Sequence, residues 1–292
     1  MPVERTLVSY GFTLIEISIV LVIIGLVTAG VLVGKDLIRQ AELRSVITDF
    51  ERYNTAVNAF RAKYNCLPGD CAYATDFFGT QTDGGGCPYP TVESGTENPL
   101  TCNGDGNGYI WGNPATAPFL QERVRFWQHL SAAGLVQHYS GIGNTSQGEP
   151  INLQAFYFGY NAPETKLPRT GFVVYHGSTW DLYFVEYFKP LSGSHVFILG
   201  TTDGCDDTTC TVHTDPVIAA SSGTTPENAF MLDRKADDGK PGGGAITAPP
   251  TDGGYFAGWT FCTTGDHTQA ETATYNLNTE TPVCPLFFRA MF

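Results

Sequence analysis

The stretch Phe12–Val33, FTLIEISIVLVIIGLVTAGVLV, decides how the rest of the chain is organised. Its residues are almost all apolar, and about 20 such residues are enough for a helix to cross the hydrocarbon core of a bilayer. One ionisable residue, Glu16, interrupts the run, and no Lys or Arg accompanies it. Because a carboxylate inside a membrane span is costly and usually functional, we expect Glu16 to meet a cation from another molecule.

Gly11 followed by FTLIEISIVLVIIG resembles the processing site of type IV pilins and of the pseudopilins of type II secretion systems. The resemblance implies that a prepilin peptidase cuts after Gly11 and that the new terminal Phe12 is N-methylated. Glu16 would then pair with the Phe12 amino group of an adjacent subunit during filament assembly. In this interpretation residues 1–11 are a leader, and residues 12–33 are the transmembrane and assembly half of the first helix.

The composition limits the partners and the compartment of the chain. Over 292 residues the formal net charge is −13, whereas nucleic-acid binding depends on clustered Lys and Arg, so we expect no nucleic-acid partner. All eight Cys lie beyond residue 65, which favours an oxidising compartment. Together with the resemblance, this implies a bacterial inner-membrane protein with its head in the periplasm before assembly, and an extracytoplasmic filament afterwards.

Residues 34–64 predict an amphipathic half of the same helix. Large apolar side chains recur at steps of three and four residues, which places them on one stripe of a helix. The stripe consists of Phe50, Tyr53, Val57, Phe60 and Tyr64. No Pro interrupts the segment, so we predict one helix from Phe12 to about Tyr64, with a separate helix after a break at Gly34 as the alternative.

Residues 65–292 are expected to form a disulfide-containing globular head. Pro68 opens a Pro-Gly-Asp sequence that is typical of a turn, so the long helix should end near Asn65. An apolar pattern from Leu120 to Leu130 predicts a second helix. Thr225 as N-cap and Pro226 in the first turn predict a short helix over Pro226–Lys235.

Segments rich in aromatic and β-branched residues, separated by Gly and Pro, predict strands in this head. They are Gln154–Tyr160, Phe172–Tyr175, Trp180–Phe188, Val196–Leu199, Tyr255–Cys262 and Cys284–Phe292. The expected fold class is therefore α+β, with an antiparallel sheet packed on the long N-terminal helix. The resemblance implies that this head is pilin-like.

A glycine-rich segment, residues 103–110 (NGDGNGYI), predicts a cation site and is called the glycine loop below. Asn103, Asp105 and Asn107 alternate with Gly, and Tyr109 offers its carbonyl, in a spacing that resembles the first half of an EF-hand-type calcium loop. The Glu at the twelfth position is missing, and Glu122 is a candidate to supply that carboxylate. Calcium sites in such loops also occur among pseudopilins. The alternative is a glycine-rich turn that binds no ion.

The eight cysteines pair most simply as sequence neighbours, although about 105 pairings are formally possible. The neighbour pairing gives Cys66–Cys71, Cys87–Cys102, Cys205–Cys210 and Cys262–Cys284. A zinc site is not expected, because the chain has no C-x-x-C sequence and no pair of His at metal-ligand spacing.

A second acidic cluster, Asp233, Asp237 and Asp238, follows the short helix and precedes a Pro-Gly-Gly-Gly sequence. We interpret it as a capped helix end with turn-forming aspartates rather than as a metal site. Arg234 and Lys235 offset its charge at the helix C-terminus.

No enzymatic motif accompanies these features, since neither a G-x-S-x-G nor an H-E-x-x-H sequence is present. We therefore expect a structural subunit of a type IV pilus-like or type II secretion pseudopilus filament, not an enzyme. Its expected partners are a prepilin peptidase, other pilin or pseudopilin subunits and the inner membrane. The alternative is a membrane-anchored binding protein or adhesin that does not assemble into filaments.

Overall fold

The computed structural model describes residues 12–79, 101–110, 121–139, 156, 158–176, 191, 193–201, 205–206, 209–210, 223–250, 261–265 and 271–292. The chain divides into two compact units, Met1–Glu42 and Leu43–Phe292. Three of the predictions lie outside the described residues: the leader with Gly11, the disulfide partner Cys87, and the strand at Trp180–Phe188.

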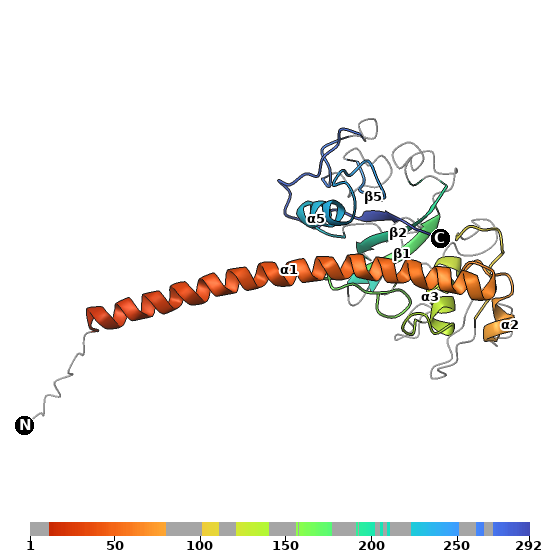
Figure 1. Ribbon diagram of the computed structural model, residues 1–292, viewed down its shortest axis with the longest axis horizontal. Helices are drawn as coiled ribbons and strands as arrows, with labels where there is room; N and C mark the ends of the chain where they lie inside the picture. Colours follow the sequence, from red (N-terminus) through yellow and green to blue (C-terminus); the bar gives the residue numbers. More distant parts are fainter. Residues whose placement is uncertain are drawn as a thin grey trace, which may run out of the picture. The chain divides into compact units, whose positions relative to one another are not determined.

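Helix α1 covers Leu14–Tyr64, 51 residues without a break (Figure 1). The prediction of one continuous helix is confirmed, and Gly34 does not interrupt it. Asn65, which has a φ of 56°, takes the helix end into the left-handed region just before the Pro-Gly-Asp turn.

The part of α1 that belongs to the first unit exposes its large apolar side chains. From Leu14 to Ile38 all of its Leu, Ile and Val side chains are exposed, including Leu26 at 70% and Leu32 at 65%. Within the described part of the chain, α1 is the one helix long and apolar enough to cross a membrane. The expected apolar N-terminal helix is therefore present.

The part of α1 from Leu43 onward contributes its predicted stripe to the core of the second unit. Tyr53, Val57 and Phe60 are buried. The ring centroid of Tyr53 lies 4.9 Å from that of Trp127, and Phe50 packs at 5.8 Å against Phe197. Aromatic pairs at such distances contribute beyond the burial of their area, so the stripe fastens this part of α1 to the head.

Four antiparallel strands form the main sheet, in the order β1-β2-β6-β5. Strand β1 covers Thr170–His176, β2 covers His195–Thr201, β5 covers Ile246–Thr247 and β6 covers Leu286–Arg289. In register, Val174 lies opposite Phe197, and Phe197 lies opposite Phe288. Phe50 of α1 contacts both Phe197 and Phe288. The α+β class with a sheet packed on α1 is thus confirmed.

Other predicted strands differ from the structure or lie largely outside the described residues. Around Gln154–Tyr160 the described residues form only an isolated bridge, Phe158 with Ala162, because the chain turns at Gly159, which has a φ of 83°. Of Tyr255–Cys262 only the last two residues are described. A two-stranded ribbon, β3 at Cys205–Asp206 and β4 at Thr209–Cys210, was not predicted.

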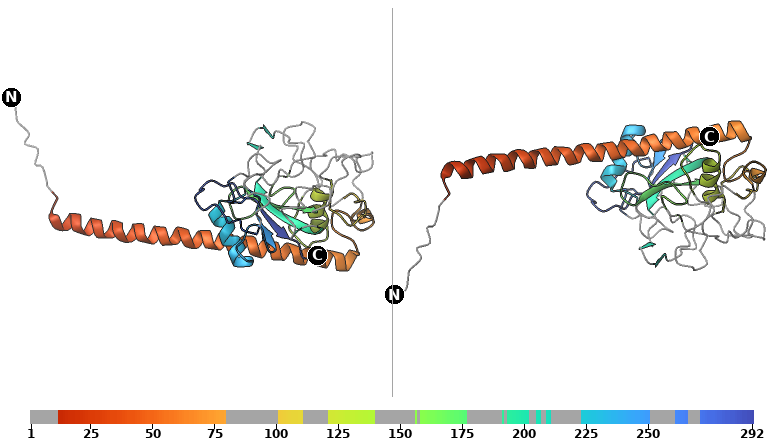
Figure 2. Two further views of the ribbon diagram at one scale, coloured as in Figure 1. Left: turned by 90° about the horizontal axis from the view of Figure 1, so that it is seen from above. Right: turned by 90° about the horizontal axis from the view of Figure 1, so that it is seen from below.

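Three shorter helices complete the described part: α2 at Ala74–Phe78, α3 at Gln121–Ala132 and α5 at Pro226–Ala236. The predicted N-cap of α5 is confirmed, because the Asn228 amide donates to Thr225 Oγ1 at 3.2 Å. Figure 2 shows α2 and α3 together near the C-terminal end of α1, with α5 at the other end of the sheet.

Two of the predicted disulfides, Cys66–Cys71 and Cys262–Cys284, are present. Cys102 is also disulfide-bonded, but its predicted partner lies outside the described residues. The Cα atoms of Cys205 and Cys210 are paired in register between β3 and β4, and their disulfide stays a prediction.

Candidate functional site

The first turn of α1 engages the carboxylate of Glu16. The Thr13 amide and hydroxyl donate to Glu16 Oε2 at 2.8 and 2.7 Å, and the Glu16 amide donates to Thr13 Oγ1 at 3.3 Å. This reciprocal pattern is a capping box. The capping box was not predicted, although Thr-x-x-Glu ahead of an apolar run is its sequence signature. The negative charge also lies at the favourable, N-terminal end of the helix dipole.

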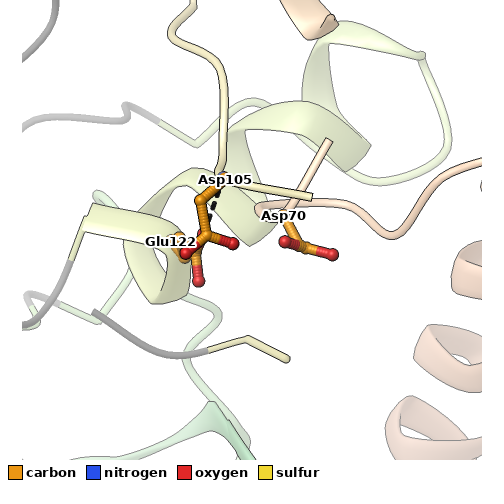
Figure 3. Close-up of side chains that lie close together, drawn as sticks. All are labelled: Asp70, Asp105 and Glu122. Carbon is orange, nitrogen blue, oxygen red and sulfur yellow. Dashed lines mark hydrogen bonds between the residues drawn. The ribbon is translucent and has the colours of Figure 1, made fainter. Parts of the chain in front are cut away.

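Three carboxylates from separate segments converge in the second unit. Asp70, Asp105 and Glu122 each offer one oxygen, and these oxygens lie within 4.8 Å of one another. Figure 3 shows the Asp105 and Glu122 side chains against each other, with Asp70 approaching from the segment that follows α1. Asp70 and Glu122 are buried, at 4% and 7% exposure, whereas Asp105 is exposed. We call these residues the carboxylate cluster.

Asp70 is held by backbone N–H groups of the glycine loop. Its Oδ1 accepts from the Asn107 amide at 3.0 Å, and its Oδ2 accepts from the Gly108 amide at 2.9 Å. Gly106 and Gly108 have φ values of 75° and 87°, which residues with a Cβ rarely adopt. The glycines therefore let the loop turn its amides toward one carboxylate.

Asp105 and Glu122 are joined through the backbone. The Asp105 amide donates to Glu122 Oε1 at 3.1 Å, the contact dashed in Figure 3. Glu122 stands in the first turn of α3, where the helix dipole favours an anion. The placement of Glu122 next to the glycine loop, expected from sequence, agrees with this contact.

The remaining predicted ligands have other neighbours. Asn103 Oδ1 accepts from the Thr75 amide of α2 at 2.9 Å. Asn107 Oδ1 accepts from the Tyr109 amide at 2.7 Å, and its Nδ2 donates to Asp105 Oδ2 at 2.8 Å. Of the five predicted ligands, the structure thus gathers the carboxylates of Asp105 and Glu122, and it adds Asp70. Asp70 was missed because its Pro-Gly-Asp context locally predicts a turn.

Burial away from solvent raises the pKa of Asp70 to about 6, and the neighbouring Asp105 adds to the rise. The amides of Gly106 and Gly108 oppose the rise. A bound cation would remove the repulsion among the three carboxylates and favour the ionised form of Asp70.

His129 of α3 links the segments around the cluster. Its Nδ1 accepts from the Gly69 amide at 2.9 Å, so the ring proton is on Nε2, which lies 3.0 Å from the Cys102 carbonyl oxygen. Complete burial lowers the pKa of His129 to about 3, which keeps the ring neutral. One imidazole thus joins the Asp70 segment to the segment that leads into the glycine loop.

The donor set of the cluster fits a hard divalent cation. Carboxylate and carbonyl oxygens are the ligands that Ca²⁺ and Mg²⁺ prefer, whereas zinc prefers imidazole and thiolate. A groove of about 580 Å³ is lined by Asp70, Gly106 and Gly108 together with Arg61 and Tyr73. Asp70 is thus the residue of the carboxylate cluster that lines this groove.

Comparison with protein-family models, with curated proteins and with solved structures finds no match.

The second acidic cluster accepts hydrogen bonds from backbone amides and from one tyrosine hydroxyl. Asp233 accepts from the Tyr275 hydroxyl at 2.8 Å and from the Gly239 amide at 3.1 Å. Asp237 Oδ2 accepts from the Ile246 amide at the start of β5, at 2.9 Å. These bonds connect the chain after α5 to β5 and to Tyr275. Asp233, Asp237 and Asp238 also each offer one oxygen, and these oxygens lie within 4.8 Å of one another. The interpretation as a capped helix end stays a prediction.

Proposed function

We propose that the chain is a prepilin-type filament subunit, of a type IV pilus or a type II secretion pseudopilus. A prepilin peptidase removes residues 1–11, and Phe12 becomes the methylated N-terminus. The head has a pilin-like fold and lies in the periplasm before assembly. The observation that supports this most is the exposed apolar part of α1, which begins with a capped Glu16. The chain acts by assembly, and no catalytic residue is assigned.

The exposed apolar surface accounts for two successive environments. Large apolar side chains from Leu14 to Val33 are exposed, and contiguous apolar surface of this kind marks a membrane or protein contact. Before assembly the bilayer covers it. In the filament the same residues pack against helices of other subunits, through a heterologous contact that does not close and so propagates.

Glu16 has a distinct role in each environment. In the single chain the capping box gives Glu16 Oε2 two hydrogen bonds, from the amide and the hydroxyl of Thr13. In the filament the amino group of Phe12 from a neighbouring subunit approaches it, and removing one member of such a pair in a low-dielectric environment leaves an uncompensated charge, which is strongly destabilising. Glu16 therefore selects the correct longitudinal position of the incoming subunit.

The test replaces Glu16 in the full chain and measures incorporation into filaments. Glu16→Val makes the span more apolar, so the chain should still enter the membrane but should be depleted from sheared filaments. Ser18→Val is the matched control, because Ser18 is another exposed polar residue of the span, and its hydroxyl donates to the Ile15 carbonyl of the same helix at 2.8 Å. Incorporation of the Glu16→Val chain at the Ser18→Val level would count against the proposal.

We further propose that the carboxylate cluster binds calcium, through Asp70, Asp105 and Glu122. Three carboxylates and neighbouring carbonyls suit an extracytoplasmic site with a Kd on the order of 10⁻⁴–10⁻³ M. The ion would fasten the glycine loop to α3 and to the segment after α1, and so would stiffen one end of the head.

A further inference from the structure

The segment that carries Asp70 is closed by a disulfide. Cys66 and Cys71 are bonded at a sequence separation of 5, and Cys71 is fully buried. Pro68, Gly69 and Asp70 lie between them. A crosslink over so short a segment removes most of the alternative conformations open to these residues. We call residues 66–71 the disulfide loop.

The disulfide loop accepts four hydrogen bonds from the backbone of the glycine loop. The Asp70 carboxylate takes the amides of Asn107 and Gly108. The Asp70 carbonyl accepts from the Gly106 amide at 3.0 Å, and the Cys71 carbonyl accepts from the Gly104 amide at 2.9 Å. The path of the glycine loop, which carries Asp105, is therefore set by the path of the disulfide loop.

On its other side the disulfide loop lies directly on α3. The Gly69 amide donates to His129 at 2.9 Å. A Cβ at Gly69 would overlap the Glu122 carbonyl oxygen, so the two backbones are in contact at this point. The disulfide loop thus contacts both segments that supply Asp105 and Glu122, and it supplies the third carboxylate itself.

We propose that the Cys66–Cys71 disulfide is a positioning device for the cation site, which assembles only when this bond is closed. The inference rests on the proposed calcium site and names what controls it. A dithiol reductant opens the bond by giving two electrons and two protons, which yields two Cys thiols while the dithiol closes into its own disulfide. With the bond open, Asp70 loses its fixed place opposite Asp105 and Glu122.

The expected size of the effect follows from the role of supporting groups around metal ligands. Loss of such support typically costs 10–100-fold in metal affinity. Because the disulfide supports one ligand directly and a second through the glycine loop, we expect the calcium Kd to rise at least about tenfold when the bond is absent.

The experiment titrates CaCl₂ into the oxidised full chain in non-ionic detergent, by calorimetry at a pH well above the pKa of Asp70, which is about 6. The variants are Cys66→Ala/Cys71→Ala and, as a matched control, Cys262→Ala/Cys284→Ala. The control also removes one disulfide, and the described backbone bonds of its two cysteines, to Gly223, Thr224 and Asn276, do not reach the cluster. We expect weakened binding only in the first variant.

A second readout is hydrogen exchange of the amides of residues 103–110, followed by peptide mass spectrometry without metal. Exchange should accelerate in Cys66→Ala/Cys71→Ala and not in the control. Unchanged calcium affinity and unchanged exchange in Cys66→Ala/Cys71→Ala would overturn the role of the disulfide. If Asp70→Asn still abolishes calcium binding in the same assay, the calcium site itself stands. Absence of binding to the oxidised wild type would overturn both. Neither result bears on filament assembly, which is measured with Glu16→Val.

Discussion

A substitution of Asp105 tests the proposed calcium site. Asp105→Asn removes one of three carboxylates while keeping the size of the side chain, so calcium should raise the melting temperature of wild type and not of the variant, by mass action on the folded state. The measurement is thermal unfolding of the full chain in detergent, in millimolar-range calcium and in chelator.

The matched control for Asp105 is Asp76→Asn. Asp76 is an exposed carboxylate in the first turn of α2 and does not belong to the cluster. Its replacement should leave the calcium response intact. Identical melting of wild type in calcium and chelator would reduce the glycine loop to a turn that binds no ion.

Asp233 should give the stability of the head a distinct pH dependence. Burial, with added repulsion from Asp238 and Asp237, raises the pKa of Asp233 to about 7. A group whose pKa is raised on folding stabilises the fold fully below its unfolded pKa, and this contribution is lost as the pH rises through the folded pKa. Wild type should therefore lose stability between about pH 4 and pH 7 for this reason.

Asp233→Asn tests this, because the amide keeps an acceptor for the Tyr275 hydroxyl but cannot ionise. The urea midpoint of the variant should fall less than that of wild type over the same pH range, by an amount equivalent to about 1 kcal/mol or more. Parallel pH profiles for the two proteins would contradict the assigned pKa shift.

At the scale of elements, the second unit is tied to α1 through its own C-terminal tail. Asn54 is buried, at 3% exposure, and its Oδ1 accepts from the Met291 amide at 2.7 Å. Asn58, which is exposed, donates its Nδ2 to the Met291 carbonyl at 3.1 Å. Two amide side chains one turn apart on α1 thus hold both polar groups of one tail residue.

Asn54→Ala should lower the free energy of unfolding by about 1–3 kcal/mol, because it removes a buried side chain that accepts from the Met291 amide and donates to the Phe50 carbonyl. Asn58→Ala removes a bond that water can replace, so its cost should stay below about 1 kcal/mol. Denaturant unfolding of both variants checks the order. Equal costs would show that burial does not decide the strength of this contact.

The elements that could be predicted share a local signal. Helix α1 has an apolar stripe and no Pro, and α5 begins with Thr225 and Pro226, so sequence spacing alone was sufficient. Strand β5 has two residues and forms only through its pairing with β6, opposite Phe287 and Phe288. Such a short strand leaves no periodicity to detect.

The candidate site was predictable only in part, because only some of its residues carry a local sequence signal. The glycine loop carries its own pattern of oxygen side chains, so Asp105 could be predicted. Asp70 reaches the cluster through tertiary contacts that depend on the disulfide loop and on Gly69 packing against α3. The capping box at Thr13 and Glu16 is local and visible in the sequence, but the cost of a carboxylate in the span favoured an intermolecular partner for Glu16 instead.

At the scale of the whole molecule, the two units have different surfaces. The second unit buries its sheet, as strands β1 and β2 are buried along their full length. The first unit exposes its apolar residues along α1. The exposed apolar residues of α1 need an apolar environment outside the chain. In the proposed function this environment is first the bilayer and then the helices of neighbouring subunits.

The most direct test of this account is the N-terminus of the chain that is present in filaments. Filaments are sheared from cells that contain a prepilin peptidase, and the subunit is analysed by intact-mass spectrometry. The account predicts a chain that begins at N-methyl-Phe12, and it predicts that Gly11→Val leaves the chain uncut and confined to the membrane fraction. A wild-type chain that retains Met1 to Gly11 and is recovered only from membranes would contradict it, and would favour an anchored binding protein instead.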